Sequence, residues 1–207
     1  MSAALDRVRT AKAKLQAAKP SASARQPLPR AGVVAAPRRP VSRERQAQDP
    51  RELFISYSST HGVDSFAQQI ADATPMQLVE VERYGVKGRF IKDLSRRIGV
   101  SAVRVYEILG VPKATVEKRS TEGTEITGSG GQAAVAMAKL LAKAHEIVGN
   151  STSPAAKDFD AGRWLGEWIE RPQPALGGRK PAELIGTPTG VEMVSRLLGS
   201  IQSGAYQ

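Results

Sequence analysis

Signals for the start and end of α-helices recur at short intervals along residues 53–207, and they constrain the fold more than any other feature. In the clearest example, Thr74 to Gln77, an N-cap threonine, a first-turn proline and a glutamine at the third helical position form a capping box. A glycine stands just after several of the predicted helices, as is typical of a helix C-cap. We predict helices over 75–84, 87–98, 101–109, 113–119, 129–149, 153–170, 181–185 and 190–200.

Extended segments are scarce in the same region. Leu53 to Tyr57 is predicted to be extended, whereas residues 78–81, which also suit a strand, lie inside the capped helix. The glycine-rich sequence 128–131 lacks the lysine and the serine or threonine of a phosphate-binding loop, so we predict a flexible linker there. A second capping box is predicted from Ser129 and Gln132, ahead of the long helix. The fold class is therefore predicted to be all-α.

The positive charge of the chain is concentrated in its first 52 residues. The chain has 207 residues with 30 Lys and Arg against 20 Asp and Glu, and residues 1–52 hold 12 basic and 4 acidic side chains. Six of the 13 prolines fall between positions 20 and 50, where large apolar side chains are few, so we predict a disordered basic arm over 1–52. This arm is interpreted as a solvated tail, a tether to DNA or a segment that mimics an organellar transit peptide. Residues 4–19 have the spacing of a short helix that forms on contact with a partner.

Composition excludes several classes of protein. The chain has no cysteine, which excludes disulfide scaffolds, thiolate metal sites and cysteine nucleophiles, and its two histidines, His61 and His145, do not make a histidine-rich metal centre. No apolar run approaches the roughly 18 residues that cross a bilayer, so we expect a soluble, cytoplasmic protein with no membrane partner. No set of residues suits nucleophilic or acid–base catalysis. We therefore expect a protein that is not an enzyme and has no cofactor and no metal.

Residues 93–119 have the organisation of a helix-turn-helix. One predicted helix begins at Ser101 and ends at Gly110, and a second begins at Lys113 after a two-residue link. In this motif the second helix lies in the major groove of DNA. On pattern alone, the alternative is an antiparallel helix pair with a solvated charged face. The predicted DNA contacts are Arg104, Lys113, Thr115, Lys118 and Arg119, and the predicted inward-facing residues are Ile108, Leu109, Val111 and Val116.

The C-terminal segment, residues 168–207, combines turn residues and a helix at fixed spacing. Its pattern consists of Trp168-Ile169, Pro172, Pro174, the ALGG sequence at 175–178, Pro181, Leu184, Thr187, Gly190, the helical Val194, Leu197, Leu198 and Ile201, and Gly204 with Tyr206. Gly177 and Gly178 are predicted to adopt positive φ in a tight turn. Thr187-Pro188 is predicted to cap the last helix, whose apolar face consists of Val191, Val194, Leu198 and Ile201.

This pattern closely resembles the toxin-binding domain of the Xre/MbcA/ParS family of bacterial antitoxins. Two positions depart from it, since the family usually has leucine at the place of Ile169 and often has asparagine at the place of Gln173. The resemblance extends over about 75–207, because family members carry an Xre-like helix-turn-helix, a connecting helix and this domain in the same order. The basic arm at 1–52 lies outside the resemblance. After it, we predict a helix-turn-helix DNA-binding domain at 53–149 and a small helical toxin-binding domain at 150–207.

The same resemblance implies a type II antitoxin that blocks its toxin and represses its own operon. The implied partners are a RES-type toxin that consumes NAD or transfers ADP-ribose, operator DNA, and a second copy of the chain in a homodimer. The candidate toxin contacts are Arg179, Lys180, Tyr206 and Gln207, because the core does not need them. The alternative is a helix-turn-helix regulator with no toxin partner, in which the C-terminal domain serves only dimerisation.

Overall fold

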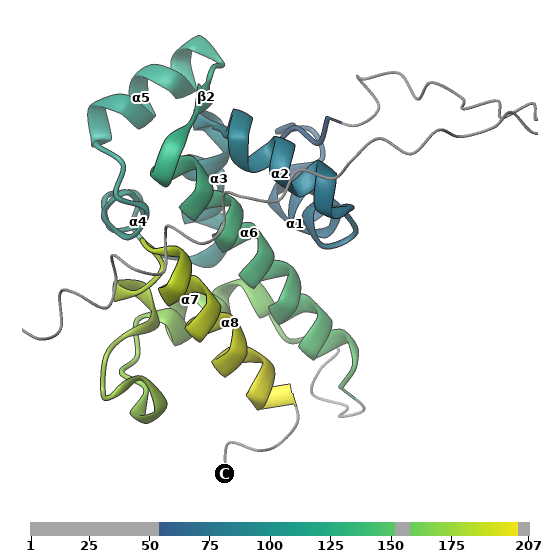
Figure 1. Ribbon diagram of the computed structural model, residues 1–207, viewed down its shortest axis with the longest axis vertical. Helices are drawn as coiled ribbons and strands as arrows, with labels where there is room; N and C mark the ends of the chain where they lie inside the picture. The colour runs from purple at the N-terminus through teal and green to yellow at the C-terminus, as the bar shows by residue number, and fades with distance from the viewer. Residues whose placement is uncertain (1–53, 152–157, 203–207) are drawn as a thin grey trace, which may run out of the picture. The chain divides into compact units, whose positions relative to one another are not determined.

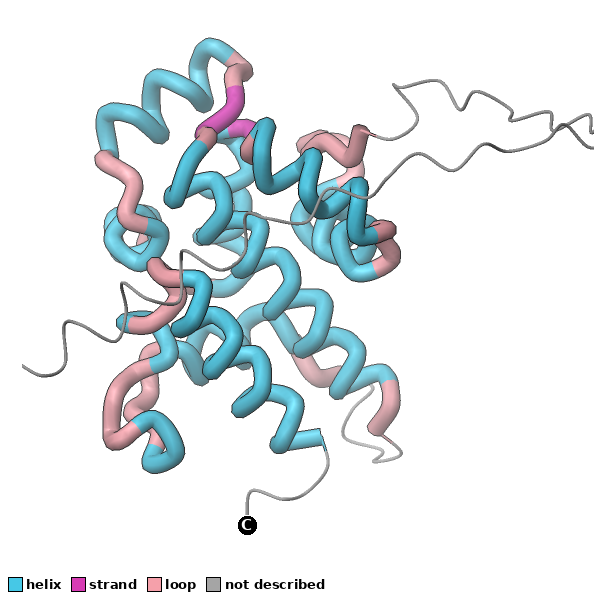
Figure 2. The backbone as a smooth tube through the Cα atoms, in the orientation of Figure 1, coloured by secondary structure: helices cyan, strands magenta, loops and turns pink. Residues whose placement is uncertain are grey.

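The computed structural model describes residues 54–151 and 158–202, all of which lie in one compact unit, Gln46–Gln207. The predicted arm at 1–52 lies outside these residues. The regular secondary structure of the described part is helical apart from two very short strands, with loops and turns between the helices, and the predicted all-α class is confirmed (Figures 1 and 2). In chain order the elements are α1 (Gly62–Ala71), α2 (Pro75–Tyr84), β1 (Val86–Lys87), α3 (Gly88–Ile98), α4 (Ala102–Leu109), α5 (Lys113–Glu122), β2 (Glu125–Ile126), α6 (Gly128–Gly149), α7 (Ala161–Ile169), the 3₁₀ turns η2 (Pro174–Leu176) and η3 (Pro181–Glu183), and α8 (Pro188–Gln202).

Helix α6 is the central element of the described residues. It packs against α1, α2 and α4 from the first half of the chain and against α7 and α8 from the second (Figure 1). Its many alanines allow these helices to approach closely, and Val135, Leu141 and Ala144 are fully buried. One continuous apolar core results, which extends from Tyr57 to Leu198.

The helix caps expected from the sequence are present at several positions. In α2, Gln77 N–H donates to Thr74 Oγ1 at 3.3 Å and Thr74 N–H donates to Gln77 Oε1 at 2.8 Å, which confirms the predicted capping box. Ser101 caps α4 by accepting from the backbone N–H of Arg104 at 3.3 Å. Each such bond satisfies a backbone donor that the first turn of a helix leaves without an intrahelical partner.

Helix α6 begins earlier than predicted, at Gly128, so the glycine-rich sequence 128–131 is its first turn rather than a linker. The prediction of a capping box from Ser129 and Gln132 was wrong. Thr127 is the N-cap residue, and its side chain makes no capping hydrogen bond. The physical reason is packing. A Cβ atom at Gly131 would lie 2.3 Å from the carbonyl oxygen of Ile126, so the glycine lets the helix start directly against the preceding chain.

Three further expectations differ from the structure. Residues 54–57 form no strand, because no neighbouring strand pairs with them, and the Tyr57 ring instead packs edge-on against Phe66 and Phe90. Helix α7 begins at Ala161, where the Asp160 side chain accepts from the N–H groups of Gly162 and Arg163, both at 3.1 Å. The start expected at Ser153-Pro154 lies outside the described residues. The helix predicted at 181–185 is the short 3₁₀ turn η3.

A two-stranded antiparallel ribbon was not predicted from the sequence. It pairs Val86 with Ile126 and Lys87 with Glu125. The ribbon joins the chain just before α3 to the chain just after α5, so it closes the three-helix segment that contains the helix-turn-helix. Strands of two residues are too short to give a recognisable alternation of apolar and polar side chains.

Candidate functional site

Helices α4 and α5 form the predicted pair of helices joined by a short turn. The turn passes through Gly110, and Val111 N–H donates to the carbonyl oxygen of Tyr106 at 2.9 Å. Ile108, Leu109, Val111 and Val116 are all buried, which confirms their predicted inward orientation. Helix α5 also packs along α3, and the Lys92 ammonium of α3 forms an ion pair with Glu117 of α5. These contacts fix α5 on the body through one side only.

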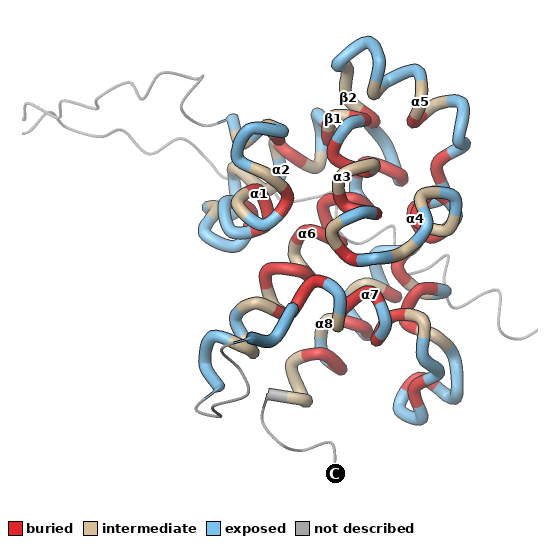
Figure 3. Tube along the Cα trace, turned by 180° about the vertical axis from the view of Figure 1, so that it is seen from behind, coloured by how far each residue is buried: buried red, intermediate tan, exposed pale blue. Residues whose placement is uncertain are grey.

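Most of α5 is exposed, and Val116 is its one buried residue (Figure 3). With about 100° of rotation per residue, Thr115, Lys118 and Arg119 lie on one side of the helix and Lys113 lies on the opposite flank. Lys118 Nζ lies 4.0 Å from Glu122 Oε1, and Arg119 Nη1 donates to Thr124 Oγ1 at 3.3 Å. Within the described residues Lys113 makes no ion pair, although its charge contributes, after that of Lys92, to lowering the pKa of Glu117.

The charge of the described region is divided along the chain. Residues 85–123, from β1 to the end of α5, carry nine basic and four acidic side chains, whereas residues 54–84 carry one and four. The region around the helix-turn-helix is therefore net +5, next to a region that is net −3. A polyanion would favour the α3–α5 segment on electrostatic grounds.

Arg104 lies apart from the exposed side of α5. Its Nε donates to Glu170 Oε1 at 2.7 Å and its Nη1 donates to Glu107 Oε2 at 3.2 Å, so its charge is shared by two carboxylates. Glu170 ends α7, and Arg104 therefore joins the helix-turn-helix to the C-terminal part of the chain. A DNA phosphate would have to compete with both carboxylates for this guanidinium.

The turn that contains ALGG is organised around Gln173, a residue that is only 7% exposed. Its backbone N–H donates to Arg179 O at 3.0 Å, its carbonyl oxygen accepts from Leu176 N–H at 2.9 Å and Gly178 N–H at 3.0 Å, and its Nε2 donates to Arg171 O at 3.2 Å. Gly177 and Gly178 have φ of 66° and 79°, which confirms the predicted positive φ. Glutamine in place of asparagine thus holds this turn from inside, a role that sequence analysis did not assign.

Of the predicted toxin contacts, two can be placed. The Arg179 side chain is exposed beside the Gly177-Gly178 turn, and Lys180 Nζ lies 3.2 Å from Glu170 Oε2. Glu170 therefore binds Lys180 and Arg104 together. Its partial burial acts to raise its pKa, but the hydrogen bonds from Arg104 and Lys180 outweigh that effect and lower the pKa below its usual value. Tyr206 and Gln207 lie outside the described residues.

Helix α8 carries the apolar face that the sequence predicted. Thr187 Oγ1 accepts from Gly190 N–H at 3.1 Å, which confirms the predicted cap. Val194 and Leu198 are fully buried, and Val191 and Ile201 are partly buried against the core. The face of α8 that points to the body is therefore occupied by packing, and the exposed surface of this region comes from the turns at 171–187 and from the outer side of α8.

A second group of charged side chains, which could not be predicted from the sequence, also joins the two halves of the chain. Arg97 of α3 donates to Asp64 Oδ2 at 2.7 Å and to Asp160 Oδ1 at 2.6 Å, and His145 Nε2 lies 3.1 Å from Asp64 Oδ1. The hydrogen bond from Arg97 lowers the pKa of Asp160. Asp160 was recognisable as an N-cap residue before an amphipathic segment. Its pairing with Arg97 was not, because sequence gives no signal for such a distant pair.

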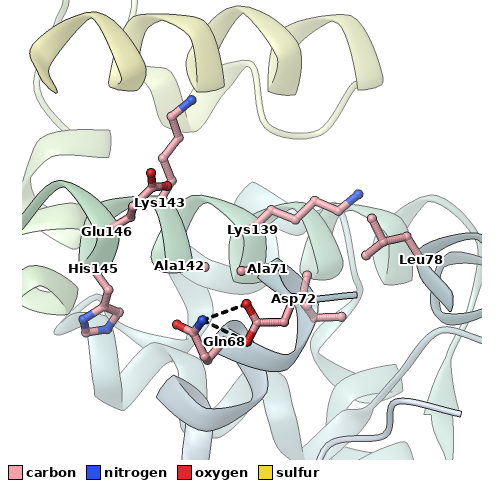
Figure 4. Close-up of a pocket in the computed structure, with 10 residues that line it drawn as sticks. Gln68, Ala71, Asp72, Leu78, Lys139, Ala142, Lys143, His145 and Glu146 are labelled. Atoms are coloured by element: carbon pink, nitrogen blue, oxygen red, sulfur yellow. Dashed lines mark hydrogen bonds between the residues drawn. The ribbon is translucent and has the colours of Figure 1, made fainter. Parts of the chain in front are cut away.

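A cavity of about 600 Å³ lies where α1, α2 and α6 meet (Figure 4). Its polar side chains are mixed in charge. The Gln68 side chain donates to both carboxylate oxygens of Asp72. Lys139 Nζ lies 2.6 Å from Glu82 Oε1, and Lys143 points toward α8. No cluster of three or more potential metal ligands occurs in the described part of the chain. None of its helices is long and apolar enough to cross a membrane.

Comparison with known proteins identifies the C-terminal, turn-rich segment. The sequence model of the antitoxin Xre/MbcA/ParS C-terminal toxin-binding domain matches residues 144–204, which extend from the end of α6 past α8. The Prs ADP-ribosylating antitoxin of Sphingobium sp. (strain YBL2) is 31% identical over 134 residues, which are 65% of this chain and 83% of that protein. The chain therefore belongs to the Xre/MbcA/ParS family of antitoxins, and its role is that of a toxin-binding antitoxin.

Proposed function

We propose that this antitoxin neutralises a RES-type toxin, an enzyme that consumes NAD or transfers ADP-ribose, and that it does so without catalysis of its own. The observation that carries the proposal is the match of residues 144–204 to a toxin-binding domain. The name of the Sphingobium relative, which links that protein to ADP-ribosylation, supports this class of toxin. The proposed contact surface is the turn around Gly177-Gly178 with Arg179 and Lys180, together with Tyr206 and Gln207.

The chemistry of such a toxin suits these residues. An enzyme that uses NAD must bind a dinucleotide, and such ligands are bound in concave pockets that contain a few precisely placed polar or charged groups. The Arg179 guanidinium is exposed and can form a bidentate pair with a carboxylate there. Tyr206 supplies a rigid aromatic anchor, the kind of residue that dominates interface energies. Inhibition follows because the seated antitoxin excludes the substrate.

Truncation after Gln202 tests the inhibitory contact while leaving α8 complete. We expect the truncated protein to keep its melting temperature and its affinity for DNA but to lose the rescue of toxin-expressing cells. Arg179→Ala in the full chain should weaken the complex with purified toxin, and Arg163→Ala, which changes another exposed arginine, serves as the control. Full rescue by the truncated protein would show that the contact lies elsewhere in the C-terminal region.

We further propose that the protein represses its own operon in the cytoplasm by binding operator DNA through α5. The net charge of +5 over residues 85–123 and the exposure of α5 support this role. In this proposal residues 53–149 bind DNA and residues 150–207 bind the toxin. A homodimer would read two half-sites about 34 Å apart, one turn of B-DNA. A reporter fused to the upstream region should be repressed by the wild type and derepressed by variants of α5.

A further inference from the structure

Two arginines of α3, Arg89 and Arg96, share one carboxylate, and we call them the α3 arginine pair. Arg89 Nε lies 3.3 Å from Asp93 Oδ2, and Arg96 Nη2 forms an ion pair with Asp93 Oδ1. One carboxylate cannot balance two guanidinium groups, so these three side chains keep a net charge of +1. The Arg89 side chain is 52% exposed and the Arg96 side chain 66%, so a ligand in solution can reach both.

The neighbouring Arg97 has the opposite balance of charge. It pairs with two carboxylates, those of Asp64 and Asp160, and its side chain is 24% exposed. Its charge is therefore neutralised within the fold, where it joins α3 to other elements. The α3 arginine pair instead leaves positive charge at the surface.

The carboxylate that orients the pair is itself fixed from the core. Tyr57 is 3% exposed, and its hydroxyl donates to Asp93 Oδ2 at 2.7 Å. Burial and this hydrogen bond raise the pKa of Tyr57, so the hydroxyl remains a proton donor. Of the five N–H groups of Arg89, only the one on Nε has a partner among residues 54–151 and 158–202. Both terminal NH₂ groups of a preoriented guanidinium are thus available to a ligand.

Helices α3 and α5 run antiparallel where they pack together. A Cβ atom at Gly88, at the start of α3, would lie 2.6 Å from the backbone nitrogen of Ser120, near the end of α5. One turn later in α3, Lys92 forms an ion pair with Glu117. The last turn of α3, which carries Arg96, therefore lies toward the start of α5.

The α3 arginine pair lies on the same face as the flank of α5 that carries Lys113. At about 100° per residue, Arg89 and Arg96 lie within about 60° of Lys92 around α3. On α5, Lys113 lies one turn before Glu117, the residue that Lys92 contacts. Lys92, chiefly through its hydrogen bond, and Lys113 both lower the pKa of Glu117, so both lie close to this carboxylate. The arginine pair and Lys113 therefore form one basic surface across the two helices.

We propose that the α3 arginine pair binds phosphate groups of the DNA backbone, beside the groove that α5 enters. The inference rests on the proposed binding of DNA, and it assigns to α3 a contact that the sequence did not predict. The paired N–H groups of a guanidinium match two oxygens of a phosphate. A hollow of about 340 Å³, lined by both arginines and by Ser59, has room for such a group. Contacts of this kind add affinity for DNA without a preference for its sequence.

The test measures the affinity of the full chain for two DNA duplexes over a series of salt concentrations. One duplex comes from the region upstream of its own gene, and the other has an unrelated sequence. Arg89→Gln with Arg96→Gln should make the slope of log affinity against log salt less steep by about 1.8, because each phosphate contact contributes about 0.9. Affinity for both duplexes should fall by the same factor, so that the ratio of the two affinities stays unchanged. Circular dichroism and melting temperatures check that the variant is folded.

Arg83→Gln with Arg196→Gln is the matched control. Each of these arginines is also exposed and pairs with an acid one turn earlier on its own helix, and the double change removes the same charge. This control should keep the wild-type slope. Arg89→Lys with Arg96→Lys keeps both charges and should restore the slope that the glutamine variant loses.

Equal slopes for the glutamine variant of the α3 arginine pair and for the control would overturn the inference. In that case, loss of the preference for the upstream duplex in Thr115→Ala would leave the proposed role of α5 standing. A wild-type protein that binds neither duplex would overturn both proposals. Weaker binding of the toxin by the glutamine variant, with unchanged affinity for DNA, would also overturn the inference, since the pair would then serve a protein partner.

Discussion

Helices α5 and α8 come from the two halves of the chain, and they use their side chains in opposite ways. Helix α5 buries only Val116 and exposes most of its residues, whereas α8 buries Val194, Leu197 and Leu198 in the core. Helix α5 is held along one side, by Val116 and by its packing against α3, so its other side is open to solvent, where we propose that it contacts DNA. A helix whose inner face is packed contributes mainly to stability, and the exposed surface of its region comes from the neighbouring turns and from the outer side of α8.

The largest effect expected from this contrast is on stability. Leu198→Ala should lower the free energy of unfolding by about 2–5 kcal/mol, because it leaves a cavity in a fully buried position. Met193→Ala, on the exposed side of the same helix, should change it little. Urea denaturation of both variants measures the difference. Equal, small effects would mean that α8 is not anchored in the core as described.

For α5 we expect the reverse pattern, in which substitutions weaken DNA binding and leave the stability of the fold unchanged. Lys113→Ala with Thr115→Ala should weaken operator binding by about 1–3 kcal/mol for each hydrogen bond to a base that the substitutions remove. The melting temperature should stay the same because neither residue is buried. Arg196→Ala on α8 removes a basic side chain from the other helix and should leave operator affinity unchanged. An unaltered operator affinity in the double variant would show that these two residues of α5 do not contact the bases of the operator.

The turn beside α8 gives a third test. Gly178→Ala should destabilise the turn by about 1–2 kcal/mol, because alanine is strained at the positive φ of this residue. A Cβ atom at this position meets nothing within 4 Å, so the effect comes from the backbone alone. Toxin affinity should fall more than operator affinity. Gly149→Ala, which also meets nothing within 4 Å and does not have positive φ, is the control.

The smallest effect is expected at Glu170, where the two halves meet. Its pKa is lowered in the folded state, so its ionised form contributes stability above its unfolded pKa, and this is lost as pH falls through the folded pKa. Between about pH 6 and pH 3, the unfolding free energy of the wild type should therefore fall more steeply than that of Glu170→Gln. Since the site is partly exposed, we expect a difference of about 1 kcal/mol or less at neutral pH. Glu167→Gln, on the solvent side of α7, should follow the wild-type profile, and identical profiles for all three proteins would contradict the prediction.

The parts of the fold that could be predicted from sequence are those fixed by local chemistry. The Thr74–Gln77 box, the glycines that end α3 and α4, and the Gly177-Gly178 turn depend on residues within a few positions of one another. The start of α6 could not be predicted, because what makes 128–131 helical is the close packing of Gly131 on Ile126. Ion pairs between residues far apart in the sequence could not be predicted either, because they too depend on packing between distant segments. Nothing near Arg97, Arg104 or Glu170 in the sequence indicates that they join α3 and α4 to the C-terminal segment.

The central position of α6 has a consequence for how the two proposed binding activities depend on each other. Because α6 shares one core with helices from both halves, the described residues should unfold as one cooperative unit. A partner that binds only the folded chain then protects all of it, by about 2.7 kcal/mol when its free concentration is a hundred times its dissociation constant. Toxin bound at the C-terminal turns would in this way lengthen the life of the helix-turn-helix, with no change in the shape of either surface.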